Sequence, residues 1–241
     1  MTHRSALILT AHGSVDPRSA AVAGALAGRI RRLRPCLDVR TAFLERSEPG
    51  LSEVLAEVAA RRHSAIVVPM LLADAYHARV DIPSMIEASG ARVEQAGVLG
   101  EDPALIAVLA QRLAEAGVSP GDRDLGVIVT AVGSSSASAN ARTATVAGAL
   151  SAGAAWAGAE VAFATGPHPT VAEAADRLRR RGARRLVVAP WFLAPGTITD
   201  RVAKAAAELG IPVAQPLGAH NLVAAALLDR YDEQRIGRLA A

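Results

Sequence analysis

Three side chains that can ligate a metal ion or accept a proton follow three separate apolar runs of this sequence. His12 and Glu45 stand directly after runs that read as short strands, and His77 lies just beyond a third run. If these runs are strands of one open parallel sheet, residues at their carboxyl ends gather along the same edge. Two imidazoles and a carboxylate suit Fe²⁺, Co²⁺, Ni²⁺ or Zn²⁺ and leave coordination positions open. A neutral histidine also accepts a proton near neutral pH, so the trio predicts metal handling coupled to proton transfer.

The chain contains an internal repeat with an offset of about 120 residues. Four segments of the first half recur in the same order in the second half. The matched pairs are 6–14 with 125–134, 39–49 with 161–169, 65–72 with 186–193, and 99–105 with 217–223. The Gly/Pro/Asp-rich stretch 117–124 separates the two halves. We therefore expect an N-terminal domain at 1–118 that carries the site and a C-terminal domain at 123–241 that repeats its scaffold.

The second half lacks the three candidate ligands. By the repeat, residues without an imidazole or a carboxylate replace them: Val132 for His12, Thr165 for Glu45, and Ile198 or its neighbour for His77. Residues that are lost together are better explained by one shared task than by three separate structural roles. The alternative is that each histidine only forms a hydrogen bond within its own loop. This alternative explains a single histidine better than it explains the simultaneous replacement of all three residues.

Both halves alternate β-rich runs with segments of helical periodicity. In the first half we expect strands at 7–10, 39–44, 66–72 and 92–96, and helices at 20–33, 51–62 and 103–116. Ser52 and Asp102 stand where N-caps are expected, and Pro103 occupies a first helical position. Near-continuous apolar strands that alternate with helices predict parallel sheets covered on both faces. The expected fold is α/β, with two similar αβα domains and a cleft between the lobes.

The composition describes a folded chain with an aliphatic core. Of the 241 residues, 51% are hydrophobic, 20% are charged and 3% are aromatic, which excludes intrinsic disorder. The single cysteine, Cys36, excludes an intramolecular disulfide and, within one chain, a cysteine-ligated zinc ribbon or iron–sulfur cluster. The Ala/Gly-rich stretch 146–165 is too weakly apolar for a membrane span. The first apolar run is too short for a signal-peptide core, so we expect a cytoplasmic protein without a membrane partner.

The positive charge of the chain comes almost entirely from arginine. Lys204 is the only lysine among 26 basic residues, and the formal net charge is +3. Basic runs at 29–34 and 177–185 fall in the last turns of expected helices, where cations suit the helix dipole. A nucleic-acid face would combine such runs with stacking aromatics. We therefore expect no nucleic-acid partner, while an anionic small molecule stays open.

Three motifs carry a resemblance to a known family. They are His-Gly-Ser at 12–14, Phe-Leu-Glu at 43–45 followed by Glu48-Pro49, and Tyr-His-Ala-Arg-Val-Asp-Ile-Pro at 76–83. This combination resembles the class II tetrapyrrole chelatases, in particular the two-domain sirohydrochlorin chelatases that insert cobalt or iron. The resemblance spans the whole chain. It implies that His12, Glu45 and His77 bind the metal and are catalytic, and that a tetrapyrrole substrate lies in the cleft. It also implies ATP-independent insertion of Fe²⁺ or Co²⁺ in siroheme or cobalamin biosynthesis, with Ni²⁺ or Zn²⁺ accepted in vitro and no nucleotide cofactor.

The substrate of the resembling enzymes carries many carboxylates, which gives nearby arginines a function. Arg46 and Arg79 flank the motifs, and an arginine fork pairs with a carboxylate through two hydrogen bonds. Arg18 lies beside the first motif. Ser14 and Tyr76 are further candidates for substrate binding, with the tyrosine ring against the macrocycle face. For each of these residues, ordinary surface placement is the alternative.

Two other enzyme classes fit these motifs less well. A histidine phosphatase needs an arginine immediately before its first histidine, where this chain has Ala11. A Rossmann-type nucleotide binder needs Gly-x-Gly-x-x-Gly, which residues 12–17 do not supply. A non-catalytic metal or tetrapyrrole carrier would need the same ligands and stays an alternative. Ligand types do not choose between iron and cobalt, and the fused repeat makes a monomer plausible because it can replace a dimer of half-length chains.

Overall fold

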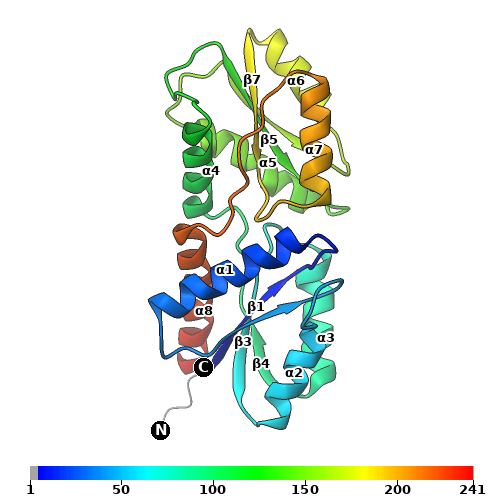
Figure 1. Ribbon diagram of the computed structural model, residues 1–241, viewed down its shortest axis with the longest axis vertical. Coiled ribbons are helices and arrows are strands. Elements are labelled where there is room, and N and C mark those ends of the chain that lie inside the picture. The colour runs from blue at the N-terminus through cyan, green and yellow to red at the C-terminus, as the bar shows by residue number, and fades with distance from the viewer. Residues whose placement is uncertain (1–4, 241) are drawn as a thin grey trace. The chain divides into compact units, whose positions relative to one another are not determined.

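The computed structural model describes the backbone of residues 5–240 and the side chains of residues 5–237 (Figure 1). Strands and helices alternate along the chain. The first repeat comprises β1 (Ala6–Ala11), α1 (Pro17–Leu33), β2 (Val39–Phe43), α2 (Leu51–Ala60), β3 (Ser64–Pro69), the π-helical turn η1 (His77–Asp81), α3 (Ile82–Ser89), β4 (Arg92–Gln95) and α4 (Pro103–Glu115). The second comprises β5 (Leu125–Ala131), α5 (Ala137–Ser151), β6 (Gly158–Phe163), α6 (Val171–Arg180), β7 (Arg185–Pro190), α7 (Thr197–Glu208) and α8 (Asn221–Ala240).

The strands form two parallel sheets with the same central topology. The first sheet has the order β2-β1-β3-β4 and the second has the order β6-β5-β7. In the second repeat the segment that corresponds to β4 makes a single bridge, from Val213 to Val188. The predicted α/β class with two parallel-sheet halves is confirmed, and the second sheet is one strand narrower. In an open sheet of this kind, loops at the carboxyl ends of the strands are where ligands bind.

The backbone hydrogen bonds at the ends of the central strands match between the two repeats. Glu45 N donates to His12 O, and Thr165 N donates to Val132 O, both at 3.0 Å. One residue earlier, Leu44 N and Ala164 N donate to the last residues of β1 and β5. This register confirms that Val132 and Thr165 occupy the positions of His12 and Glu45.

Each sheet is covered by helices on both faces, and the core is aliphatic. Leu7, Ile8 and Leu9 are consecutive in β1 and all fully buried, as expected for a strand that packs on both sides. On the first sheet, α1 and α8 cover one face while α2 and α3 cover the other (Figure 1). On the second sheet, α6 and α7 lie opposite α4 and α5 (Figure 1). The continuous apolar strands therefore have the partners on both faces that their sequences predicted.

One predicted helix cap is confirmed and one is wrong. The carboxylate of Asp102 accepts from Ala104 N at 2.8 Å, as an N-cap should. Ser52 is not a cap, because α2 already begins at the fully buried Leu51 and has Gly50 at its N-cap position. Glu48 Oε2 instead accepts from Gly50 N at 3.1 Å. Burial of the leucine decides where this helix begins.

The compact units of the structure are divided differently from the expected domains 1–118 and 123–241. One unit extends to Gly100 and includes the chain from Ala219 onward, and the other runs from Glu101 to Gly218. Helix α8 packs on α1 and β3, whereas α4 packs against α5 and β7. The buried Tyr231 of α8 donates its hydroxyl hydrogen to Ser5 O at 2.5 Å. The last helix of each sequence repeat thus completes the unit built on the other repeat, because each sheet needs that helix to cover one face.

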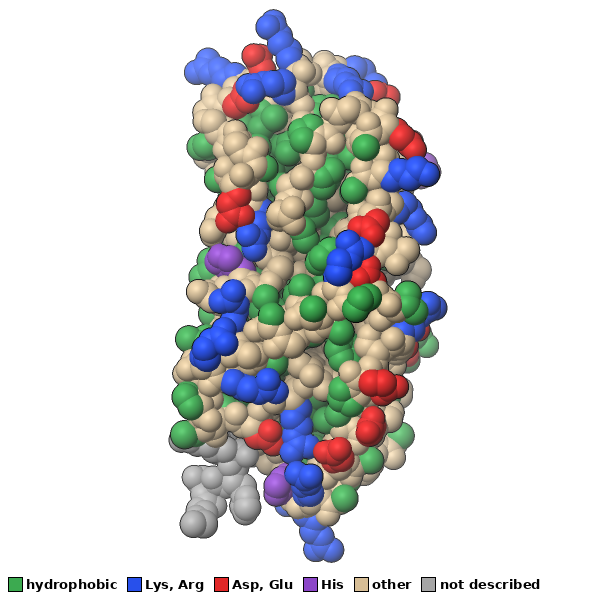
Figure 2. All heavy atoms as spheres, viewed as in Figure 1, with side chains coloured by type: hydrophobic (Ala, Val, Ile, Leu, Met, Phe, Trp, Pro, Cys, Tyr) green, Lys and Arg blue, Asp and Glu red, His purple; other side chains and the backbone are tan. Residues whose placement is uncertain are grey.

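The basic runs of the chain lie beside acidic partners. Near the end of α6, Arg181 pairs with Glu160 at 2.7 Å, and Arg185 pairs with Asp122. On the face drawn in Figure 2, basic and acidic side chains lie next to one another at several places. Among the described helices, none is both long and apolar enough to cross a membrane.

Candidate active site

A glycine turn at the end of β1 brings the first predicted ligand against the second. Gly13 has φ +91°, and a Cβ atom at this position would lie 1.7 Å from Glu45 O. Only glycine permits a backbone approach this close with a positive φ. His12 precedes this turn, and its Nε2 lies 3.3 Å from Glu45 Oε1. The close approach of two loops therefore pairs an imidazole with a carboxylate.

The third predicted ligand comes from the turn that follows β3. His77 is the first residue of η1, and Ile82 N donates to His77 O across five residues, which defines the wide π turn. The rings of His12 and His77 have their centroids 4.5 Å apart and are tilted by 42°. Three segments remote in sequence thus converge at the carboxyl edge of the first sheet. The structure brings together the three residues that the sequence singled out.

This cluster is open to solvent. The side chains of His12, Glu45 and His77 are 47%, 45% and 42% exposed. Among the side chains of residues 5–237, no group of three or more His, Cys, Asp or Glu residues is already arranged to hold a metal ion. The arrangement in the structure is therefore a close pair of imidazoles with a carboxylate against one of them.

Partial burial and the proximity of His77 lower the pKa of His12 below that of an ordinary histidine. Loss of hydration disfavours the charged imidazolium, and a positive charge on His77 would repel it. Glu45 acts in the opposite direction, Arg46 adds to the lowering, and Asp81 opposes it. The sum favours a neutral His12 that can accept a proton or donate a lone pair at neutral pH.

Asp81 belongs to this site and was missed in the sequence. Its Oδ2 lies 2.6 Å from Nδ1 of His77, and both side chains are partly buried. Two signals point to it: the two residues are four apart in one helical segment, and the repeat replaces His77 and Asp81 with Ile198 and Val202. A carboxylate that binds one ring nitrogen of a histidine sets which nitrogen stays free.

Arg46 occupies a strained position next to the cluster. Its φ is 61°, in the left-handed region, and the equivalent residue of the second repeat is Gly166 with φ 97°. A side chain in this region costs about 1–2 kcal/mol relative to the right-handed conformation. From this position Arg46 Nε lies 3.3 Å from Glu45 Oε2. The first repeat thus places a cation beside the candidate ligands where the second has glycine.

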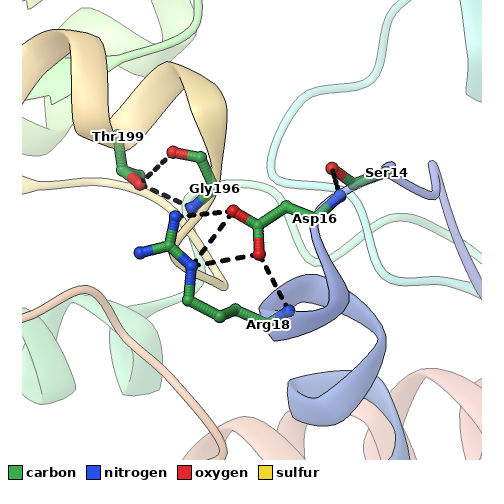
Figure 3. A network of polar contacts seen from close by, with 5 residues as sticks. All are labelled: Ser14, Asp16, Arg18, Gly196 and Thr199. Carbon is green, nitrogen blue, oxygen red and sulfur yellow. Dashed lines mark hydrogen bonds and ion pairs between the residues drawn. The ribbon is translucent and has the colours of Figure 1, made fainter.

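The other candidate arginines also have carboxylate partners. Arg79 donates to Asp74 at 2.7 Å. Arg18 pairs with Asp16 at 2.5 Å, and Asp16 also caps α1 by accepting from Arg18 N (Figure 3). A carboxylate of a bound ligand would therefore have to replace the internal carboxylate partner of each arginine or share the guanidinium group with it.

The hydroxyl of Ser14 has a structural role in this loop. It accepts from Asp16 N at 3.0 Å, one of the contacts drawn in Figure 3. Ser47 links the two loops, since its Oγ accepts from Ser14 N and donates to Ser14 O. In the second repeat, Asn140 makes the equivalent pair of hydrogen bonds to Ser134. In both repeats a side chain thus holds the backbone of this serine. The contact belongs to the scaffold, because it occurs both in the repeat that has the candidate metal ligands and in the repeat that lacks them.

Exposed apolar side chains stand in the segments that carry the two histidines. Tyr76 is 62% exposed, and its ring lies edge-on to His77 with centroids 6.2 Å apart. Val15 and Val80, which stand in the same two loops as His12 and His77, are also exposed. Neighbouring apolar side chains on functional loops suit contact with an apolar ligand surface.

The second unit lacks this chemistry at the corresponding edge. Its α7 begins at Thr197 as a regular helix where the first unit has the π turn. Thr199 Oγ1 accepts from Gly196 N and donates to Gly196 O, both at 2.7 Å (Figure 3). Thr165 Oγ1, at the position of Glu45, donates to Val132 O at 2.8 Å. These hydroxyl groups form hydrogen bonds with nearby backbone groups, whereas the residues at the site of the first unit contact other candidate metal ligands.

Two similar parallel-sheet halves, one of which carries an open His/His/carboxylate cluster, are the features of the class of chelatase-like α/β proteins. The chain belongs to the CbiX family, whose model matches residues 6–116 and 126–234. The resemblance inferred from the motifs is thereby confirmed for the family and the fold.

One relative and two solved structures show how far this similarity extends. A sirohydrochlorin cobaltochelatase of Priestia megaterium is 26% identical over 172 residues, which are 68% of this chain and 56% of that protein. The match therefore spans little more than half the length of that relative. SirB from Bacillus subtilis with Fe3+ has a TM-score of 0.79 at 22% identity and covers 95% of both chains. The sirohydrochlorin chelatase SirB of Bacillus subtilis subspecies spizizenii in complex with cobalt has a TM-score of 0.75 at 21% identity, over 95% of this chain and 94% of that chain.

Proposed function

We propose that this protein is a sirohydrochlorin chelatase, a lyase that inserts Fe²⁺ or Co²⁺ into a polycarboxylate tetrapyrrole without ATP. The observation that carries the proposal is the 4.5 Å approach of the His12 and His77 rings beside Glu45. The second repeat keeps the scaffold and lacks all three residues. Membership in the CbiX family and the metal-bound SirB structures of the same fold support the same assignment.

The chemistry of insertion matches these side chains. The metal ion must lose water, and two N–H protons must leave the macrocycle. A neutral imidazole can bind the ion or accept a proton, and the lowered pKa of His12 favours its neutral form. Glu45 would offset the positive charge of the ion, while His77 offers a second imidazole. A partly coordinated ion can be passed on to the macrocycle, whereas a closed four-ligand site would retain it.

The remaining candidates would position the macrocycle. Arg46 and Arg79 would bind its carboxylates, exchanging with their internal partners Glu45 and Asp74. Tyr76 would lie against the ring face, and Ser14 would contribute through the loop that it holds. The expectations of a cytoplasmic monomer, without nucleic-acid or membrane partners, stay predictions from the sequence.

The direct test is metallation of sirohydrochlorin followed by absorbance, with Fe²⁺, Co²⁺, Ni²⁺ and Zn²⁺ in parallel and without ATP. The wild-type protein should accelerate insertion of Fe²⁺ or Co²⁺ over the protein-free mixture. His12→Ala and His77→Ala should reduce the rate to the protein-free level while the Tm stays nearly unchanged, because both side chains are nearly half exposed. His63→Ala, at an exposed position outside the site, is the matched control and should retain full activity.

A carrier is the alternative, and the same experiment separates it. A carrier would bind the metal or the tetrapyrrole stoichiometrically and leave the insertion rate at the protein-free value. Unfolding of His12→Ala or His77→Ala would return these histidines to structural roles.

A further inference from the structure

The two ring nitrogens of His77 have different surroundings. Nδ1 lies 2.6 Å from Asp81 Oδ2, within hydrogen-bond distance. An ionised carboxylate only accepts hydrogen bonds, so Nδ1 must carry the proton in this pair. The lone pair of neutral His77 then resides on Nε2. The contact therefore selects one tautomer of the ring.

The backbone of η1 holds this pair in place by an unusual arrangement. Ile82 N donates to His77 O, five residues earlier, and not to Ala78 O as it would in a regular α-helix. Pro83 has no N–H that could donate to Ala78 O. Gln95 Nε2, from β4, donates to Ala78 O at 2.7 Å instead. A side chain of the adjacent strand thus satisfies a carbonyl within the wide turn. The π turn is a supported element of the fold.

The second repeat lacks the whole arrangement. The regular helix α7 occupies the place of η1, with Ile198 and Val202 at the positions of His77 and Asp81. Val202 is buried in the apolar core of its unit. The imidazole, its carboxylate partner and the π turn are therefore present together in one repeat and replaced together in the other.

We propose that Asp81 is a positioning residue for His77. By accepting from Nδ1–H it orients the ring and keeps Nε2 unprotonated, so that Nε2 can bind the metal ion or accept a proton. This inference rests on the proposed function only for the use made of Nε2. The tautomer itself is a property of the metal-free protein. Carboxylate partners of this kind fix ring orientation and raise the ligand strength of metal-binding histidines.

The substitution Asp81→Asn reverses the hydrogen-bonding preference with little change in volume. An amide can donate to Nδ1, which would place the proton of the neutral ring on Nε2 and remove the lone pair from the side used for chemistry. Loss of the correct tautomer is the known consequence of this kind of change in catalytic histidine–aspartate pairs. In Asp81→Glu a carboxylate remains, so the native tautomer should be retained.

The first measurement is the ¹⁵N chemical shift of the ring nitrogens of His77 in the metal-free protein at a pH where the ring is neutral. In the wild type, Nδ1 should be protonated and Nε2 unprotonated. Asp81→Asn should reverse this assignment, and Asp81→Glu should restore it. Asp176→Asn makes the same chemical change at an exposed carboxylate of α6 and should leave His77 as in the wild type.

The second measurement is Co²⁺ affinity by visible absorption, together with steady-state metallation. Asp81→Asn should weaken Co²⁺ binding by about 10- to 100-fold, the usual effect of removing such a partner. The turnover number should fall while KM for the tetrapyrrole changes little, because Asp81 is not proposed to touch the macrocycle. Asp176→Asn should change neither quantity.

The outcomes separate this inference from the proposed function. A protonated Nε2 in the wild type, or an unchanged tautomer in a folded Asp81→Asn protein, would overturn the role of Asp81 even if metallation is fast. If the tautomer changes as expected but the wild type does not accelerate metallation, Asp81 positions His77 and the chelatase assignment fails. If Asp81→Asn does not fold, the wild-type and Asp81→Glu spectra still decide whether a carboxylate holds Nδ1–H.

Discussion

At the scale of single residues, the charge state of His12 depends on competing neighbours. Burial and His77 are the main causes that lower its pKa, while Glu45 acts against them. A histidine in water titrates near pH ~6.5. Because the pKa in the folded protein is lower, His12 stays neutral further into the acid range than a free histidine would. His12 thus keeps a free lone pair at neutral pH.

The pH profile of metallation should reflect this shift. If neutral His12 is required, kcat/KM should fall on the acid side only as the pH drops through a value below about 6.5. Arg46→Gln removes a positive neighbour and should move this limb to higher pH, since Arg46 contributes to the lowering. NMR titration of the His12 ring in the metal-free protein measures the same pKa directly. A rate that stays constant below the pKa measured for the His12 ring would contradict the need for neutral His12.

At the scale of elements, one glycine turn occurs in both repeats but has a different use in each. The Cβ of a residue at Gly13 would lie 1.7 Å from Glu45 O, and at Gly133 it would lie 1.8 Å from Gly166 O. Both turns have φ near +90°. In the first repeat the turn sets the distance between His12 and Glu45; in the second it joins loops without candidate ligands. The scaffold requirement is shared, and the chemistry is not.

These twin glycines offer a matched pair of variants. Gly13→Ala and Gly133→Ala should each destabilise the fold by at least about 1 kcal/mol, because both force a side chain into positive φ against a backbone carbonyl. The Tm should fall by a few degrees in each case. Only Gly13→Ala should also weaken Co²⁺ binding, since it displaces the loop that carries His12. Equal loss of Co²⁺ binding in both variants would show that the effect comes from general destabilisation.

At the scale of the whole molecule, the terminal helix α8 completes the unit that contains the site. Besides the Tyr231–Ser5 hydrogen bond, Arg34 Nη1 donates to Asp232 at 3.0 Å, and Arg230 Nε donates to Val98 O at 3.0 Å. These contacts tie α8 to α1 and to the segment after β4. The part of the chain farthest from His12 in sequence therefore stabilises the sheet whose edge carries it.

This packing predicts which fragment folds. A chain in which residues 219–241 precede residues 1–100 through a flexible linker should give a dispersed amide spectrum as a monomer and bind Co²⁺. Residues 1–118 alone should not form a folded monomer, because the sheet loses α8. In addition, this fragment would expose the apolar face of α4. In the whole protein that face, formed by Leu105, Val108, Leu109 and Leu113, is buried in the second unit. A folded, monomeric 1–118 fragment would contradict the division into units.

Much of the fold and site follows from local patterns in the sequence. Apolar runs separated by helical periodicity gave the parallel sheets, because a strand buried on both faces must be apolar along its whole length. The internal repeat identified His12, Glu45 and His77 as a set, since the second half has the same scaffold without them. Their convergence then follows from the topology, which places the carboxyl ends of parallel strands at one edge.

Other features were decided only by the tertiary structure, because they depend on distances between segments that no local pattern specifies. The bond from Asp81 to His77 lies in a π turn whose Ala78 carbonyl is satisfied by Gln95 of β4, a contact between segments that no local pattern specifies. The pairing of Arg46 with Glu45 requires a left-handed backbone that the sequence would favour only for glycine. The placement of α8 depends on which of the two sheets has an uncovered apolar face. The sequence of an amphipathic helix does not specify this, because its apolar side can pack on either sheet. Local periodicity therefore determined the elements and the internal repeat the candidate ligands, while packing determined their partners.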